Sequence, residues 1–356
     1  MSGNWALAEG AVQAGCDAYF GYPITPQNEV TEYMARRMPE AGRVFLQSES
    51  ELAAISMLMG GAATGKRVMT SSSSPGISLM QEGISYMCGC ELPCVIANVV
   101  RGGPGLGNIG PSQADYFQAV KGGGHGDYHL CVLAPASVQE TFDFVFLAFD
   151  IAFEYRNPVL ILSDGLTGQM MEPLAIRPPE HLLRARETPE PSTWALDGAD
   201  GRQARHIKSL YLGDGVLEAH NRKLQRNYAR MAAAEVRCET YRAGDADFLF
   251  VAYGICSRVC REAVDRLRRE GMPVGLFRPI TLWPYPAAAL RAAAASVRTV
   301  MAVELSCGQM VEDVRLAIEG HCPVEFYGRP GGELMTVEEV LAAARTAFAA
   351  PLRAAS

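Results

Sequence analysis

Short runs of β-branched and apolar residues alternate with helix-period segments along most of this chain. The alternation is typical of a mainly parallel sheet covered by helices, because parallel strands need long crossover connections. The expected strands lie at 18–22, 44–46, 67–71, 94–100, 130–134 and 159–162 in the first half, and at 248–253, 274–277, 300–303 and 324–326 in the second. Helices are expected at 258–269 and 309–318. The sequence therefore predicts an α/β fold, with a doubly wound parallel sheet followed by a smaller α/β domain.

Several helix starts can be read directly. Thr25 can cap a helix that has Pro26 at its first position, where the missing N–H costs nothing. Residues 137–140 and 336–339 form capping boxes, and the helix opened by the second is expected to end near Pro351. Large apolar residues recur at helical spacing after the first box and predict a core-facing stripe: Phe142, Val145, Phe146, Phe149 and Phe153.

The middle of the chain has a different character. Residues 173–240 contain repeated prolines and glycines, which interrupt regular structure, and one basic helix is expected at 216–235. We expect this segment to be an extended connector that wraps over other parts of the molecule. It would separate a first domain at 1–172 from a second at 241–356.

Composition excludes some classes of function. The formal net charge of −7 argues against a nucleic-acid-binding protein, which would carry a basic face. The apolar stretches, such as 92–100, are too short to cross a bilayer, and the N-terminus lacks the features of a secretory signal. The ten cysteines include no C-x-x-C pair, so we expect small buried thiols and no metal site. A cytoplasmic enzyme is the expectation.

Three polar residues follow early strands, at the edge where open parallel sheets bind ligands. These are Thr25, Glu49 and Arg101, and the last opens a glycine-rich loop at 101–107. A hydroxyl, a carboxylate and a guanidinium would suit a small anionic substrate beside a cofactor. The same residues could instead be a helix cap, a first-turn carboxylate and a surface charge, and spacing alone favours this structural interpretation.

The motifs around these residues resemble those of 2-oxoacid:ferredoxin oxidoreductase alpha subunits. The matching segments are YPITP at 22–26, QSE at 47–49, SSPGISLM at 73–80, RGGPGLG at 101–107, PSQAD at 111–115, DGLTGQM at 164–170, RPITLWP at 278–284 and ELSCGQMVEDV at 304–314. The resemblance covers nearly the whole chain except the connector. Around 71–86 and 101–128 the chain is most similar to the 2-oxoisovalerate (3-methyl-2-oxobutanoate) branch of the family. It implies a pyrimidine-type thiamine-diphosphate-binding domain followed by a transketolase C-terminal-like domain.

The resemblance also implies roles for residues. Glu49 would be the catalytic carboxyl that is hydrogen-bonded to N1′ of the cofactor's aminopyrimidine, a role that requires burial against the cofactor. Glu51, two residues later, is the alternative. Thr25 and Arg101 would bind the 2-oxoacid, and the guanidinium can pair with its carboxylate in a bidentate manner. Cofactor contacts would come from Tyr22, Pro23, Thr25, Glu49 and Ser73.

Half of a thiamine diphosphate site is missing from the sequence. In such enzymes a G-D-G motif followed by an Asn holds the diphosphate and its Mg²⁺, but the nearest candidate here, 163–165, is followed by no Asn before Asn221. The resemblance implies that a beta subunit supplies this half together with [4Fe-4S] clusters. It also implies gamma and ferredoxin-like delta subunits, coenzyme A as co-substrate, and ferredoxin as electron acceptor.

Other readings stay open at this point. A 2-oxoglutarate or pyruvate enzyme would share Thr25, Glu49 and Arg101 and differ around the substrate side chain. A transketolase-like transferase without redox chemistry and a non-catalytic assembly subunit are further alternatives. His125, in a glycine-rich loop, could transfer protons or contact coenzyme A, or make a local hydrogen bond in a turn.

Overall fold

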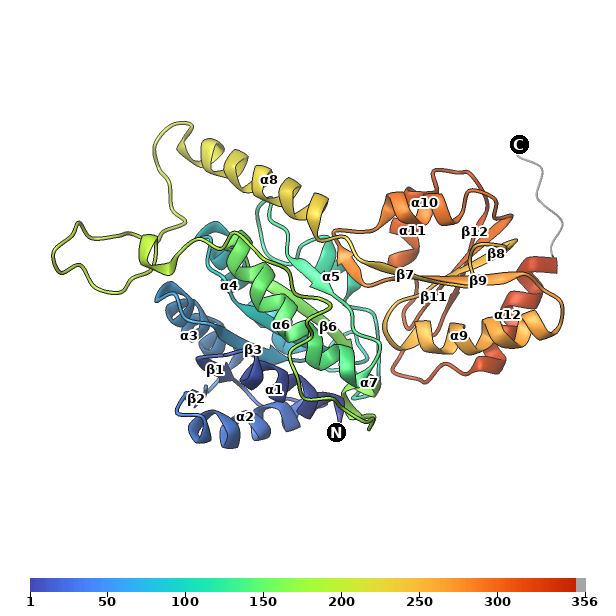
Figure 1. Ribbon diagram of the computed structural model, residues 1–356, viewed down its shortest axis with the longest axis horizontal. Coiled ribbons are helices and arrows are strands. Elements are labelled where there is room, and N and C mark those ends of the chain that lie inside the picture. The colour runs from blue at the N-terminus through green and yellow to red at the C-terminus, as the bar shows by residue number, and fades with distance from the viewer. Residues whose placement is uncertain (350–356) are drawn as a thin grey trace.

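The computed structural model describes residues 1–349, which form two α/β units joined by a long connector (Figure 1). The first unit is a seven-stranded sheet of order β10-β5-β6-β4-β3-β1-β2, parallel except for β10. Its strands are β1 (Ala18–Gly21), β2 (Val44–Gln47), β3 (Val68–Ser72), β4 (Val95–Val100), β5 (Cys131–Leu133), β6 (Val159–Asp164) and β10 (Thr281–Trp283). The six strands expected in the first half are confirmed.

Helices on both faces bury the centre of this sheet. They are α1 (Gly3–Gln13), α2 (Asn28–Glu40), α3 (Glu51–Ala63), α4 (Ser74–Gly89), α5 (Tyr116–Val120), α6 (Val138–Tyr155) and α7 (Gly165–Gln169). Every residue of β3, β4 and β6 is buried, as expected for parallel strands covered on both faces. Strand β2 is different, because it is an edge strand that leaves Val44 and Leu46 exposed.

The helix expected to start at Thr25 begins instead at Asn28, so that prediction was wrong. Tertiary contacts hold residues 25 and 26 in a turn. The Thr25 carbonyl accepts from Arg101 Nη1 at 2.9 Å, and the Pro26 carbonyl accepts from Asn4 Nδ2 at 2.7 Å. Carbonyls engaged with distant side chains are not available to begin a helix at this point.

The predicted capping box at 336–339 is confirmed, and the one at 137–140 is confirmed in part. Ser137 Oγ accepts from the Glu140 N–H, although the Glu140 carboxylate returns to the N–H of Ala136 rather than to that of Ser137. The Thr336 and Glu339 pair bonds reciprocally at the start of α12 (Val337–Ala349). The phenylalanine stripe of α6 is buried, as predicted. The expected end of α12 near position 351 lies outside the described residues.

The second unit is a five-stranded sheet of order β12-β11-β8-β9-β7. Its strands are β7 (Cys238–Tyr241), β8 (Phe248–Val251), β9 (Val274–Pro279), β11 (Thr299–Glu304) and β12 (Val324–Gly328), and its helices are α9 (Gly254–Arg269), α10 (Ala287–Ala293), α11 (Met310–Ile318) and α12. Four strands were expected, whereas β7 and β10 were not. Both are short strands that pair antiparallel, and β10 returns to the first sheet to pair with β5.

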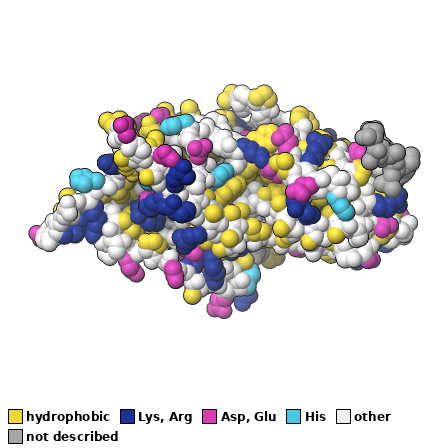
Figure 2. Space-filling view, turned by 90° about the horizontal axis from the view of Figure 1, so that it is seen from above, with side chains coloured by type: hydrophobic (Ala, Val, Ile, Leu, Met, Phe, Trp, Pro, Cys, Tyr) yellow, Lys and Arg dark blue, Asp and Glu magenta, His cyan; other side chains and the backbone are white. Residues whose placement is uncertain are grey.

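The connector has little regular structure before its predicted basic helix, which is confirmed as α8 (Val216–Ala234). A single 3₁₀ turn, Pro191–Thr193, precedes residues 196–215, here called the arm. The arm projects away from the sheet beyond α4 (Figure 1), and Leu210 and Leu212 on it are 69% and 85% exposed. Seen from above, Lys and Arg side chains gather on the half of the molecule that carries the arm (Figure 2). Along residues 1–349 no helix combines the length and hydropathy needed to traverse a bilayer.

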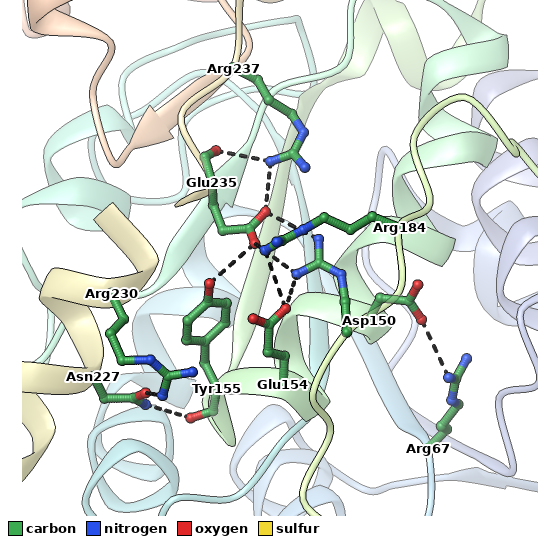
Figure 3. A network of polar contacts seen from close by, with 10 residues as sticks. Arg67, Asp150, Glu154, Tyr155, Arg184, Asn227, Arg230, Glu235 and Arg237 are labelled. Carbon is green, nitrogen blue, oxygen red and sulfur yellow. Dashed lines mark hydrogen bonds and ion pairs between the residues drawn. The ribbon is translucent and has the colours of Figure 1, made fainter. Parts of the chain in front are cut away.

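A buried ion cluster fastens the connector to the first unit (Figure 3). Glu235, which follows α8, is fully buried and accepts from Arg184 at 2.7 Å, Arg186 at 2.7 Å and Arg237 at 2.8 Å. Arg184 and Arg186 also contact Glu154 on α6. Because arginines from two parts of the connector meet one carboxylate, the cluster fixes how the connector crosses α6.

Candidate active site

Four neighbouring strands, β4-β3-β1-β2, end at one edge of the first sheet and bring the predicted residues together. Thr25 follows β1, Glu49 follows β2, Ser73 follows β3, and Arg101 follows β4. Arg101 and Thr25 are in direct contact through the hydrogen bond to the Thr25 carbonyl. This is the edge where open parallel sheets bind ligands.

Arg101 is buried, with 8% of its surface exposed. Its Nη1 and Nη2 donate to the carbonyls of Thr25 and Leu106, at 2.9 and 3.0 Å, whereas Nε has no partner. Among the ion pairs of residues 1–349 none involves this guanidinium. A buried cation without a carboxylate is costly, so the arrangement favours an anionic ligand.

Thr25 is half-buried in the turn after β1. Its Oγ1 accepts from Asn28 Nδ2 at 3.2 Å, which leaves the hydroxyl proton available for a ligand. A buried hydrogen-bond chain of Tyr19, Ser71 and Gln27 anchors the turn to β3. Before this turn Tyr22 is half-buried and Pro23 is exposed, so both can face a bound molecule.

The two carboxylates after β2 lie in different surroundings. Glu49 is exposed in the bend before α3, whereas Glu51, at the first position of α3, is only 6% exposed. A Cβ at Gly76 would come within 2.6 Å of Glu51 Oε1, so this carboxyl lies against the first turn of α4. Ser50 caps α3, and Glu51 is therefore the first-turn acid that the sequence reading had placed at Glu49. Of the two, Glu51 has the burial that the proton-sharing role requires.

The interior beside these groups is polar, and some of its hydroxyls lack hydrogen-bond partners. Ser72 and Ser73 are fully buried, and neither hydroxyl has a hydrogen-bond partner. Ser72 Oγ would lie 2.0 Å from a Cβ at position 76, so glycine is needed there. Unpartnered hydroxyls beside a buried carboxyl fit a nitrogen-rich ring such as an aminopyrimidine better than they fit an apolar ligand.

A set of side chains behind Arg101 was not singled out from the sequence. Ser74 Oγ accepts from the Arg101 N–H at 3.1 Å, and the Ser74 N–H donates to Asn98, whose amide donates to Asp115 at 2.8 Å. Burial raises the pKa of Asp115. Asp115 stood in the PSQAD motif quoted above, but no pattern in the sequence indicated this contact.

A cavity of about 470 Å³ opens between this network and the second unit. Its lining includes one basic side chain, Arg101, and one acidic side chain, Asp115. Residues 111–117 close one wall by bonding to the second unit, where Gln113 meets the Tyr253 carbonyl and the Leu305 N–H. The second α/β unit therefore helps to hold the loop that begins at Arg101.

Other candidate residues lie elsewhere. His125 is exposed, and its carbonyl accepts from Ser85, eleven residues along α4 from Ser74, which is about 16 Å of helix. Asp164, the nearest match to a diphosphate motif, instead caps α7 through the N–H groups of residues 166 and 167. All ten cysteines are free, and residues 1–349 contain no group of three or more His, Cys, Asp or Glu side chains placed to hold a metal.

Comparison with known proteins gives a consistent result. Residues 9–237 match the family described as pyruvate flavodoxin/ferredoxin oxidoreductase, thiamine diphosphate-binding, and residues 246–340 match pyruvate:ferredoxin oxidoreductase core domain II. The ketoisovalerate oxidoreductase subunit VorB of Methanothermobacter thermautotrophicus is 51% identical, covering 96% of this chain and 95% of that protein. The 2-oxoglutarate synthase subunit KorA of Methanothermobacter marburgensis is 36% identical, with 96% of each chain covered.

Solved structures agree on the fold. The 2-oxoglutarate:ferredoxin oxidoreductase of Magnetococcus marinus, solved with 2-oxoglutarate, coenzyme A and succinyl-CoA, aligns with a TM-score of 0.86 and 29% identity over 97% of this chain. The alignment spans 64% of that longer chain. A split-gene transketolase in an inactive beta4 tetramer, at 17% identity and a TM-score of 0.62, shares the fold. The chain belongs to the 2-oxoacid:ferredoxin oxidoreductase family of thiamine-diphosphate-binding oxidoreductases.

Proposed function

We propose that this chain is the alpha subunit of a coenzyme A-dependent complex that oxidatively decarboxylates a branched-chain 2-oxoacid, 2-oxoisovalerate, and passes the electrons to ferredoxin. The observation that carries the proposal is the buried Arg101, which has no carboxylate partner and lies at the same sheet edge as the buried Glu51. The 51% identity to a ketoisovalerate oxidoreductase subunit supports the substrate class.

The residues present fit thiamine diphosphate on its aminopyrimidine side. When bound, this cofactor supplies a nucleophilic carbon and an electron sink for decarboxylation. Glu51 would hold a proton at N1′ of the pyrimidine, because a carboxyl shielded from water shares a proton more readily than an exposed one. Its burial favours it over Glu49, the residue that the motif match preferred. Tyr22, Pro23, Thr25 and Ser73 would surround the ring.

Substrate binding would fall to Arg101 and Thr25. The guanidinium would pair with the 2-oxoacid carboxylate, and the Thr25 hydroxyl would donate to a substrate oxygen. The adjoining cavity has no basic side chain besides Arg101 among its lining residues. This favours an uncharged side chain over the second carboxylate of 2-oxoglutarate, which would need another cation.

Other subunits would complete the enzyme. We propose a beta subunit that holds the diphosphate, Mg²⁺ and [4Fe-4S] clusters, together with gamma and ferredoxin-like delta subunits, in the cytoplasm. The exposed edge strand β2, with Val44 and Leu46 beside Glu49, provides an apolar surface next to the site for such a partner.

The test is a matched pair of variants in the reconstituted complex. Glu51→Gln should lower the rate of 2-oxoisovalerate-dependent ferredoxin reduction by about 10²–10⁴-fold, and Glu49→Gln by only a few-fold. The reverse result would move the carboxyl role to Glu49 and leave the function intact. If both variants stay within a few-fold of wild type, the chain is a non-catalytic assembly subunit and the proposal fails.

A substrate panel separates the remaining alternatives. We expect the highest kcat/KM for 2-oxoisovalerate, with lower values for pyruvate and 2-oxoglutarate. A preference for 2-oxoglutarate would overturn the substrate assignment. Visible absorption from iron–sulfur clusters is expected in the purified complex, and its absence would instead favour a transketolase-like transferase.

A further inference from the structure

A second cavity lies at the opposite end of the first sheet. It has a volume of about 350 Å³, and its lining includes Glu91, Arg156, Trp194, Arg205, His206 and Lys208. One wall is made by the residues that end α4 and α6, and the other by the arm and the turn before it. Helices α4 and α6 lead into the amino ends of β4 and β6, whereas Arg101 follows the carboxyl end of β4. The six residues of β4, about 20 Å, separate the two places.

The cavity wall carries an excess of positive charge. Arg156, Arg205 and Lys208 line it together with the ring of His206, whereas the lining contains a single acid, Glu91. The Glu91 carboxylate is already paired with Lys223 on α8, at 2.5 Å. In a chain with a net charge of −7, such a local excess of cations indicates an anion site.

Arg156 shows the excess most clearly. It ends α6 with φ of 48°, a left-handed conformation that is strained for a residue with a side chain. Its guanidinium lies 4.4 Å over the Trp194 ring and donates to the Glu91 carbonyl, but it forms no ion pair within residues 1–349. Burial lowers the pKa of Arg156, and the nearby Glu91 carboxylate offsets this only in part.

Lys208 contributes a second cation to the lining, from the arm. Its Nζ lies 5.4 Å over the Tyr211 ring, and the ion pairs of the described chain do not include it. Arg205 is different, because it bonds to the Ala195 carbonyl and to Asp197 and so ties the arm to its base. The cavity therefore combines a tethering arginine with two cations that have no acid partner.

We propose that this cavity binds a phosphate-bearing small molecule of nucleotide size. Its volume is at the lower end of the range of small-molecule sites. Several cations that line one cavity suit a multiply charged phosphate better than a single carboxylate, and the guanidinium fork matches phosphate oxygens. The lining comes partly from the arm, so the ligand would also order the arm against α4 and α6 (Figure 1).

Titration calorimetry on the full chain, and on the reconstituted complex, tests the proposal without relying on turnover. The probes are ADP, pyrophosphate and inorganic phosphate, with adenosine as the uncharged control. We expect ADP to saturate below about 1 mM, adenosine not to bind, and affinity to fall with salt. Pyrophosphate binding equal to that of ADP would also support the site and would show that phosphate alone is recognised.

Two variants and a matched control separate the cavity from general surface charge. Lys208→Ala and His206→Ala, both on the exposed arm, should each weaken ADP binding by about five-fold, through loss of one partly exposed ion pair for Lys208 and of one hydrogen bond for His206. Arg226→Ala removes an exposed cation of α8 that does not line the cavity and should change nothing. ADP should also slow tryptic cleavage of the arm. The proposal is overturned if no phosphate-bearing probe saturates, or if all three variants weaken binding equally.

Discussion

Two of the charged residues that the chain buries near its first sheet, Glu235 and Arg101, have opposite surroundings. Glu235 receives hydrogen bonds from three arginines, and its cluster holds the connector on α6 (Figure 3). Arg101 meets only carbonyl oxygens and keeps one nitrogen without a partner. A fully paired buried charge maintains structure, whereas an unpaired one has capacity left for a ligand. The same comparison separates the tethering Arg205 from Arg156 and Lys208 in the second cavity.

The largest effect on stability should come from a substitution at Glu235, the paired buried charge. Glu235→Gln leaves three arginines around a neutral group and should lower the free energy of unfolding by about 3–5 kcal/mol. Urea denaturation of the full chain measures the loss. Turnover of whatever complex still assembles should stay near wild type. A loss below about 1 kcal/mol would show that the cluster does not hold the connector.

A substitution at Arg101, the unpaired buried charge, should instead lower activity and leave stability nearly unchanged. Arg101→Gln should lower kcat/KM for 2-oxoisovalerate by about 30–1000-fold, because the substrate carboxylate would lose its buried partner, while stability stays within about 1 kcal/mol of wild type or rises. Arg101→Lys keeps the positive charge but not the bidentate guanidinium, so its kcat/KM should lie between those of wild type and Arg101→Gln. Equal kcat/KM for all three proteins would show that Arg101 is a scaffold residue.

Of these two buried charges, acid should titrate Glu235 and not Arg101. Burial by itself would raise the pKa of Glu235, but hydrogen bonds from Arg186, Arg237 and Arg184 outweigh it and hold the pKa at about 2, below the usual 4.5. Because the folded pKa is the lower one, the stabilisation is complete above about pH 4.5 and is lost as the pH falls toward 2. It amounts to about 3 kcal/mol at most. Denaturation midpoints of wild type and Glu235→Gln should converge across this window, and parallel curves would contradict the assignment.

The smallest effect on stability should come from an ion pair that is exposed to solvent. Glu218 and Arg222 form an exposed i,i+4 pair on α8, at 2.7 Å. Glu218→Gln should lower stability by only about 0.3–0.5 kcal/mol, because water screens both groups. The same denaturation assay measures it. A loss comparable to that of Glu235→Gln would show that burial is not what distinguishes the two sites.

Local signals in the sequence predicted most of the fold. Ten strands, the two capping boxes and the buried phenylalanine face of α6 were all readable, because apolar periodicity and capping residues act over a few positions. Strands β7 and β10 were missed, since each is short and exists through pairing with a distant partner strand. Thr25 failed as a helix cap for the same reason, because Arg101, 76 residues away, holds its carbonyl.

The sequence by itself determined the family, the two α/β units and the set of residues at the carboxyl edge of the first sheet. It did not determine which of two neighbouring glutamates is buried, nor that Arg101 would have no acid partner. Burial and ion pairing depend on segments far apart in the chain, such as Gly76 beside Glu51 and the arginines around Glu235. Only the tertiary structure brings those segments together, and only there does a charge become either paired or available.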